Sequence, residues 1–436
     1  MANARAAFAD KVFGLSARDT SVRTEFLAGL TTFLTMSYII FVNPVILKDA
    51  GMDQGSVLVA TCLAAAVGCL VMGFYANLPV ALAPAMGTNV YFTYGIVLGL
   101  GVTWQTALGA VFLSGILFVA LSISPARAWI INAIPQNLKM AMAAGVGLFL
   151  IIVGLRSAGL IVDHPATLVT VGDLSSMEAI LAVSCFILIG TLDARKVPGA
   201  LLLGIIIITI IGAVLGLGPI SGIVSAPPDM SPTWLAMDVA TAFDLSLAAV
   251  VLSLLFVDTF ETAGTLVGVT QPAGLVDEDG NIPNLSRAMF ADSIATVAGA
   301  VVGTSSTTSY VESVSGVRAG GRTGLTAVVV GCLFLVGLFF APLAGSIQSY
   351  ATGPAIIYVG CVMAANLAKI DWEDLTTYVP CVVTAVSMPL TYSIATGIGF
   401  GFISYAALKL FSGRTREATI GIMVLAGLFL LRFIFL

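Results

Sequence analysis

Long apolar runs separated by short polar breaks fill most of this chain, and the runs are continuous rather than alternating. Continuous runs of this length predict membrane-spanning helices, because transmembrane strands would alternate between apolar and polar positions. Before a polar segment at 218–245, the pattern predicts seven spans, at 24–46, 56–76, 80–100, 105–123, 138–160, 177–192 and 197–217. After that segment it predicts seven more, at 246–270, 288–302, 304–320, 323–343, 353–368, 374–390 and 392–411.

The equal number of spans on each side of segment 218–245 indicates two repeats. Because each half has an odd number of spans, the second half has the opposite orientation in the membrane. We therefore divide the chain into a first repeat (1–217), a connecting loop (218–245), a second, inverted repeat (246–411) and a C-terminal apolar segment (412–436). Within the last of these, the apolar stretch 418–435 is either a fifteenth span or an interfacial helix, and the pattern does not choose between them.

Two spans at corresponding positions, the third and the tenth, are interrupted. The third, PVALAPAMGTNVYFTYGIVLGLGV, contains several Pro and Gly residues, and the tenth, VVGTSSTTSYVESVSGVRAGG, is rich in Ser and Thr. Interrupted spans at matching places in inverted halves point to the binding site of a transporter. Both contain β-favouring runs, at 90–94 and 307–311, so we expect a short extended stretch followed by a half-helix in each. Two ordinary kinked helices are the alternative.

Composition and charge agree with a polytopic α-helical membrane protein. Only 9% of the 436 residues are charged, against about 25% in soluble domains. Segment 218–245 contains no Lys or Arg, whereas basic residues cluster before the first span and beside later ones, so the positive-inside rule predicts a cytoplasmic N-terminus in the cell (inner) membrane. The flanking basic residues are Arg5, Lys11, Arg18, Arg23, Arg127, Lys139, Arg195, Lys196, Arg318, Arg322, Arg414 and Arg416.

Several chemistries have no support in the sequence. There is no Walker motif, no dinucleotide fingerprint in its required context and no HExxH, which excludes ATP-driven transport by this chain alone. The six cysteines lack CxxC spacing and are interpreted as small buried apolar residues. We expect no cofactor, no metal site and no nucleic-acid partner. A membrane-embedded enzyme would need a nucleophile–base pair in the spans, and none is present.

Three carboxylates lie toward the middle of predicted spans: Asp258, Glu261 and Glu312. A charged acid there costs at least about 2.5 kcal/mol, so such residues often mark a substrate or proton path. Asp258 and Glu261 are three residues apart and share one helix face. Two acidic groups at so short a distance rarely both ionise, which makes the pair a candidate proton acceptor. The alternative for either residue is an acid that only hydrogen-bonds to a neighbouring Ser or Thr.

Glu312 follows the polar stretch of the tenth span. Its carboxylate can accept two parallel N–H bonds from a flat heterocycle, and Asn89 in the third span offers both a donor and an acceptor. The alternatives are that Glu312 caps a half-helix and that Asn89 is a turn residue. Nearby aromatic residues such as Phe92 and Tyr310 are candidates to stack on a planar ligand, although packing is the more common role.

Other polar residues receive a structural interpretation. Asp292 lies near Arg287 in the sequence, which favours a structural or gating ion pair. Tyr38 belongs to a polar stripe in the first span that we interpret as supporting lining. The lone histidine, His164, lies in a loop outside the spans, so any proton coupling must depend on carboxylates.

Four sequence blocks resemble those of a known family. FADKVFGLSARDTSVRTEFLAGLTTFLTMSYIIFVNP, APAMGTNVYFTY, FVDTFETAGTLVGV and ADSIATVAGAVVGTSSTTSYVESVSGV are similar to the signature blocks of the purine-permease (AzgA-like) branch of the nucleobase–cation symporter-2 group. The resemblance covers nearly the whole chain. It implies two inverted seven-helix repeats arranged as core and gate domains, short antiparallel strands in spans three and ten, a homodimer, and proton-coupled uptake of adenine, guanine or hypoxanthine.

The same resemblance implies roles for individual residues. It assigns substrate binding to Glu312, Glu261 and Asn89, with Phe92 and Val311 beside them. It assigns proton coupling to Asp258 and Glu261, without saying which acid carries the proton. The uracil and xanthine branches place a histidine in the first or eighth span, and its absence here favours the purine branch.

An anion transporter or channel of the related sulfate or bicarbonate type would share this fold and is the alternative function. Such a protein should place neutral or basic residues before the half-helix N-termini. This chain has Glu312 there.

Overall fold

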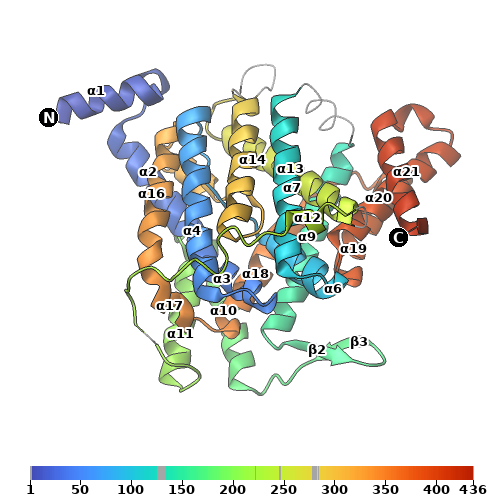
Figure 1. The fold of residues 1–436 in the computed structure, drawn as a ribbon, viewed down its shortest axis with the longest axis horizontal. Coiled ribbons are helices and arrows are strands. Elements are labelled where there is room, and N and C mark those ends of the chain that lie inside the picture. Colours follow the sequence, from blue (N-terminus) through green and yellow to red (C-terminus); the bar gives the residue numbers. More distant parts are fainter. Residues whose placement is uncertain are drawn as a thin grey trace.

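The computed structural model describes residues 2–124, 134–220, 222–244, 247–276, 282 and 284–435; Arg127 lies outside them. Within these residues, ten helices are long and apolar enough to cross a membrane. Three shorter apolar helices accompany them, at Ala200–Val214, Leu375–Thr391 and Ile420–Ile434. The protein is therefore a polytopic helical membrane protein (Figure 1).

The helices follow the predicted spans closely. The first half consists of α1 (Ala2–Phe13), α2 (Val22–Met36), α3 (Ile39–Asp49), α4 (Gln54–Val71), β1 (Leu82–Pro84), α5 (Met86–Val90), the π-helical η3 (Tyr91–Val97), α6 (Leu98–Leu100), α7 (Trp104–Ile123), α9 (Gln136–Ser157), β2 (Ile161–His164), β3 (Leu168–Val171), α10 (Met177–Ala194) and α11 (Ala200–Val214). The second half consists of α12 (Val239–Ala242), α13 (Ala248–Thr270), α14 (Leu285–Val302), β4 (Thr307–Ser309), α15 (Ser313–Arg318), α16 (Gly324–Gly337), α17 (Ala341–Ser346), α18 (Ser349–Ala364), α19 (Leu375–Thr391), α20 (Ile394–Phe411) and α21 (Ile420–Phe435).

Two helices form the first span. Helix α2 ends at Met36 and α3 begins at Ile39, which leaves Ser37 and Tyr38 in a turn between them. Pro44 lies inside α3 and has no N–H to donate to the preceding turn. The predicted span at 24–46 is confirmed, as Val22–Asp49, and the turn within it places a buried tyrosine near its middle.

The third and tenth spans are interrupted as predicted, and they meet. Strands β1 and β4 pair antiparallel, with Leu82 opposite Ser309 and Pro84 opposite Thr307. Two further backbone bonds extend the ladder at either end, from Ala85 N–H to the Ser306 carbonyl and from Tyr310 N–H to the Ala81 carbonyl, both 2.9 Å. The two broken segments thus satisfy each other's backbone groups within the bilayer, as lipid-embedded irregular segments must.

The position of the extended stretch was right in the tenth span and wrong in the third. Residues 307–309 form β4, but residues 90–94 are helical, in α5 and η3, and the strand lies earlier, at 82–84. The β-branched and aromatic residues at 90–94 instead pack inside the protein, where Val90, Tyr91 and Phe92 are buried. Their preference for strands is a preference for packed surfaces, and a buried helix supplies one as well.

The helices pack into two groups, and each group contains helices from both halves of the chain. The core group consists of α2–α7 and α13–α16. The gate group consists of α9–α11 and α18–α20, with α21 packed on α20. In Figure 1 the N-terminal helix α1 lies at one end of the molecule, and the exposed β2–β3 hairpin, which contains His164, lies at the other.

The packing pairs have the pattern of an inverted repeat. Helix α4 of span two packs on α16 of span eleven, and α14 of span nine packs on α7 of span four, which is the equivalent pair after exchange of the halves. In the gate group, the same exchange of halves converts the packed pair of α10 and α18 into the packed pair of α19 and α9. A two-fold relation between the halves therefore organises both groups.

Glycines allow the central pair of the gate group, α9 and α18, to approach closely. A Cβ at Gly147 would lie 2.6 Å from the carbonyl oxygen of Gly360, and a Cβ at Gly360 would lie 2.6 Å from that of Gly147. Two helical turns away, Gly154 and Gly353 face each other in the same way. A Cβ at Gly154 would lie 2.8 Å from the Gly353 carbonyl oxygen, and a Cβ at Gly353 would lie 3.0 Å from that of Gly154. Small residues at such crossings are the usual means of close helix packing in membranes.

We expect Gly147→Ala to destabilise the protein, because the added methyl group forces the α9 and α18 backbones apart. Overpacking of this kind costs about 1–3 kcal/mol. The matched control is Gly190→Ala in α10, where the nearest atom is the Tyr358 ring at 3.8 Å. Thermal unfolding of the purified protein should show a lower midpoint for Gly147→Ala and no loss for Gly190→Ala; equal midpoints would contradict the close crossing.

Candidate functional site

The β1–β4 pairing brings together polar groups from both halves of the chain. All six residues from Thr304 to Ser309 are buried. Thr296 of α14 binds the strand through its hydroxyl, which donates to the Thr307 carbonyl at 2.8 Å. From span one, the Asn43 amide donates to Thr61 and Thr304 at 2.8 and 2.9 Å. These contacts fix the irregular backbone of span ten against spans one, two and nine.

Asp258 and Glu261 lie on α13 beside this strand, as the spacing predicts. Asp258 is fully buried, and neither of its carboxylate oxygens has a hydrogen-bond partner among the described residues. The nearby Ser306 hydroxyl is likewise without a partner of good geometry in that part of the chain. Unpaired buried polar groups are rare in native proteins and often have a functional reason.

Glu312 begins α15, and its side chain is held from the first span. The Tyr38 hydroxyl donates to the Glu312 carboxylate at 2.9 Å. Tyr38 lies at the break between α2 and α3 and is 1% exposed, whereas Glu312 retains partial exposure. The tyrosine therefore orients the acid and leaves part of it accessible. From the sequence, Tyr38 is expected only to line the site as part of a polar stripe, and its bond to Glu312 has no local signal.

Asn89 lies in α5, the short helix that follows β1. Its side-chain oxygen accepts a hydrogen bond from the Ser305 hydroxyl. Its amide nitrogen is buried and has no acceptor among the residues that the structure describes. The side-chain oxygen of Asn89 thus connects spans three and ten, and its amide nitrogen can donate to another group.

Asp292 is part of this cluster, and its predicted pairing with Arg287 was wrong. The Asp292 carboxylate is fully buried and accepts hydrogen bonds from Thr262 at 2.6 Å and from Ser309 at 3.0 Å. The Arg287 guanidinium instead lies 5.5 Å from the centre of the Tyr75 ring. The Ser/Thr-rich run of span ten was the only sequence signal for this network.

The four carboxylates share one electrostatic neighbourhood. Asp258 interacts with Asp292 and Glu261, and Glu261 interacts with Glu312. Because like charges this near in a low-dielectric setting rarely all ionise, the cluster is suited to taking up a proton. The structure therefore brings together the three acids that the sequence singled out and adds a fourth.

The predicted neighbours Phe92 and Val311 have opposite environments. Phe92 is fully buried, so its ring offers no surface to a ligand in this conformation. The Val311 side chain is 51% exposed and adjoins Glu312. Tyr310, a second stacking candidate, donates its hydroxyl to the Pro84 carbonyl at 2.6 Å and so joins the two broken spans.

A small pocket between the core and gate groups reaches Glu261. Its other walls are apolar residues of α9, α13, α18, α19 and α20, together with Lys139, whose ammonium lies 5.8 Å from the centre of the Phe260 ring. The volume is about 50 Å³, far below the roughly 300 Å³ of a small-molecule site. A ligand larger than water thus requires the two groups to separate. From the sequence, Lys139 is expected only as a basic residue that flanks a span.

Two inverted repeats that meet at broken spans, with acids around the break, are the arrangement of a membrane transporter. The Permease family (Xan_ur_permease) matches residues 23–400, and the chain belongs to this family. It is 47% identical to the adenine permease AdeP of Escherichia coli over 98% of this chain and 96% of that protein. It is 45% identical to the guanine/hypoxanthine permease PbuG of Bacillus subtilis over 96% of this chain and 97% of that protein.

Solved structures with low sequence identity have the same fold. The transmembrane domain of the cyanobacterial bicarbonate transporter BicA superimposes with a TM-score of 0.65 at 15% identity, covering 87% of this chain and 97% of that one. SLC26A9 gives 0.63 at 12% identity, covering 90% of this chain and 66% of that one. At these identities the likeness concerns the fold alone.

We expect Asp292→Ala to destabilise the protein, because the Thr262 and Ser309 hydroxyls lose their buried acceptor. A loss of about 1–3 kcal/mol is typical. Asp292→Asn keeps one acceptor oxygen and should lose less. The control is Asp163→Ala, whose side chain is 80% exposed. If Asp292→Ala unfolds in detergent at the same midpoint temperature as Asp163→Ala, the structural role of Asp292 is contradicted.

Proposed function

We propose that this protein is a proton-coupled importer of purine nucleobases. The observation that carries the proposal is the polar cluster at the two broken spans, in which Glu312 and Asn89 retain unused hydrogen-bonding capacity. Relatives named as adenine and guanine/hypoxanthine permeases cover nearly the whole chain and support the purine class.

Recognition of the base rests on Glu312 and Asn89. The accessible part of the Glu312 carboxylate is an acceptor for ring N–H and exocyclic amine groups, and the Asn89 amide nitrogen is a donor for a ring nitrogen or carbonyl. Val311 supplies exposed apolar surface beside them. Glu261 contributes from α13, while Phe92 contacts the base only in a conformation that uncovers its ring.

The proton is carried by Asp258 or Glu261. Protonation before docking neutralises one member of the acid cluster, which lowers the cost of enclosing the base in a dry site. The Asp258 carboxylate has no hydrogen-bond partner of good geometry in the described part of the chain, although the Ser306 hydroxyl lies nearby. Glu261 faces the seam between the core and gate groups. Either acid can then couple its charge to movement of the core group against the gate group.

Anion transport on the same fold is the less suitable function for this site. Bicarbonate or sulfate would approach four carboxylates, and like charges enclosed together are strongly unfavourable. A flat uncharged base avoids that repulsion and uses the acids as acceptors.

The membrane context completes the proposal. We infer a cell (inner) membrane protein with a cytoplasmic N-terminus, on the distribution of Lys and Arg. We further propose that the first repeat is 1–217 and the second 246–411, that the core and gate groups move as domains, and that the protein assembles as a homodimer.

Substitution of the acids should abolish transport with retention of the fold. We expect Glu312→Gln together with Glu261→Gln to reduce uptake of labelled hypoxanthine or adenine at least about a hundredfold, because charge-assisted hydrogen bonds are worth about 1.5–3 kcal/mol each. Glu178→Gln together with Glu373→Gln, at two exposed positions, is the charge-matched control. Normal uptake by the double variant would overturn the site assignment.

Coupling to protons should appear in energised vesicles. We expect accumulation of labelled base to follow an imposed inward proton gradient and to collapse when a protonophore removes it. Asp258→Asn should retain exchange of base across the membrane but lose gradient-driven accumulation, if it is the carrier. Accumulation that persists without the gradient would exclude proton coupling.

A further inference from the structure

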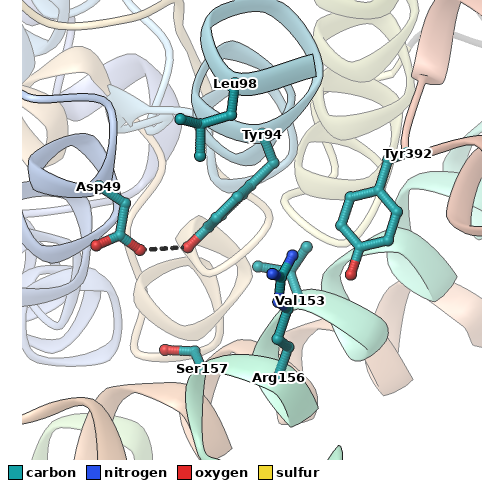
Figure 2. A pocket seen from close by; sticks show the side chains of 7 residues that line it. All are labelled: Asp49, Tyr94, Leu98, Val153, Arg156, Ser157 and Tyr392. Atoms are coloured by element: carbon teal, nitrogen blue, oxygen red, sulfur yellow. Dashed lines mark hydrogen bonds between the residues drawn. The ribbon is translucent and has the colours of Figure 1, made fainter. Parts of the chain in front are cut away.

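A second pocket, separate from the acid cluster, lies at the end of the molecule away from α1. It has a volume of about 370 Å³, within the range of small-molecule sites. Figure 2 shows the side chains that line it: Asp49, Tyr94, Leu98, Val153, Arg156, Ser157 and Tyr392. None of these residues belongs to the cluster at the broken spans.

The pocket spans the seam between the two helix groups. Asp49 ends α3 and Tyr94 lies in η3, both in the core group. Arg156 lies near the end of α9, and Tyr392 follows α19, both in the gate group. A molecule bound here would therefore contact both groups, which must move past each other during transport.

Its chemistry fits a flat heterocycle with donors and acceptors on its edge. Tyr94 and Tyr392 provide two aromatic rings, and Leu98 adds exposed apolar surface. The Arg156 guanidinium can donate two parallel bonds to a carbonyl and ring nitrogen, the arrangement by which arginine binds the O6 and N7 atoms of guanine. The Asp49 carboxylate accepts from N–H groups and already receives the Tyr94 hydroxyl at 2.6 Å.

The polar groups at this pocket are only weakly committed elsewhere. Arg156 pairs with Asp163 at 3.5 Å, and these side chains are 53% and 80% exposed. Exposed pairs of this kind contribute little and exchange readily. Arg156 can therefore turn to a ligand at small cost.

One helical segment connects this pocket to the proposed substrate site. Asn89 and Tyr94 are five residues apart on the continuous helical stretch formed by α5 and η3. The outer end of the broken third span thus lines the pocket, and the same span carries Asn89.

We propose that this pocket, here called the outer pocket, is a second nucleobase site at which a purine binds before it reaches Glu312 and Asn89. Arg156 and Asp49 read the edge of the base, and Tyr94 and Tyr392 contact its face. This inference rests on the proposed function, since it assigns the same substrate to a second place on its path.

Uptake kinetics give the first test. We expect Arg156→Gln to raise the KM for hypoxanthine about tenfold at unchanged maximal rate, because a charge-assisted bond to the base is lost. Lys48→Gln, one residue from Asp49 and not part of the pocket lining, removes the same charge as the matched control. A lower maximal rate at unchanged KM would mean that Arg156 only latches the two helix groups, and would overturn the proposal.

Ligand protection gives a test that is independent of transport. In purified Glu312→Gln protein with exposed Cys332 and Cys361 replaced by alanine, Ser157→Cys provides a thiol at the pocket. We expect hypoxanthine to slow its reaction with a maleimide, and Arg156→Gln to abolish that protection. Unprotected labelling in the presence of saturating hypoxanthine would overturn the outer pocket.

The two proposals fail in different ways. If the wild-type protein neither binds nor transports hypoxanthine or adenine, the proposed function itself is wrong. If it transports them while Arg156→Gln has a normal KM and Ser157→Cys is unprotected, only the outer pocket is wrong.

Discussion

The structure depends on one constraint, which is that backbone N–H and C=O groups in lipid need hydrogen-bond partners within the protein. Spans three and ten both stop being helical near the middle of the protein, and each would be costly alone. The two spans satisfy each other's backbone groups, because β1 and β4 pair antiparallel and the flanking residues Ala81, Ala85 and Tyr310 extend the ladder. Antiparallel pairing between equivalent segments is what an inverted repeat produces, so the symmetry of the fold and the irregularity of the site have the same origin.

Once the strands are paired, side chains from other spans complete the site. Tyr38 reaches Glu312 from the break in span one, and Thr262 and Ser309 hold Asp292 between α13 and β4. Hydroxyl groups supply these bonds, and a hydroxyl stabilises a carboxylate less than a cation does. The acids are thus held in position without being permanently neutralised, as the proposed proton coupling requires.

The sequence predicts the fold well because its signals are local and long. Apolar runs locate the spans, and Pro, Gly, Ser and Thr mark the interruptions in spans three and ten. The prediction is less accurate where a contact with residues distant in the sequence determines the conformation or role of a residue. Residues 90–94 favour strands by type but lie in a helix, since β4 pairs instead with 82–84. The role of Asp292 depends on side chains 17 and 30 residues away, a relation that sequence spacing does not carry.

The contrast between the two pockets bears on how the protein moves. The pocket at Glu261 has about 50 Å³ and the outer pocket about 370 Å³, and both lie on the seam between the core and gate groups. The Gly147–Gly360 and Gly154–Gly353 crossings hold the gate group together by backbone contact, so that group resists internal deformation. Glycines also allow close approach across the seam, where a Cβ at Gly95 would lie 3.1 Å from the Tyr392 carbonyl oxygen and a Cβ at Gly87 would meet Val146. Because both pockets lie between the groups, the proposed movement of the core group against the gate group would widen or narrow them.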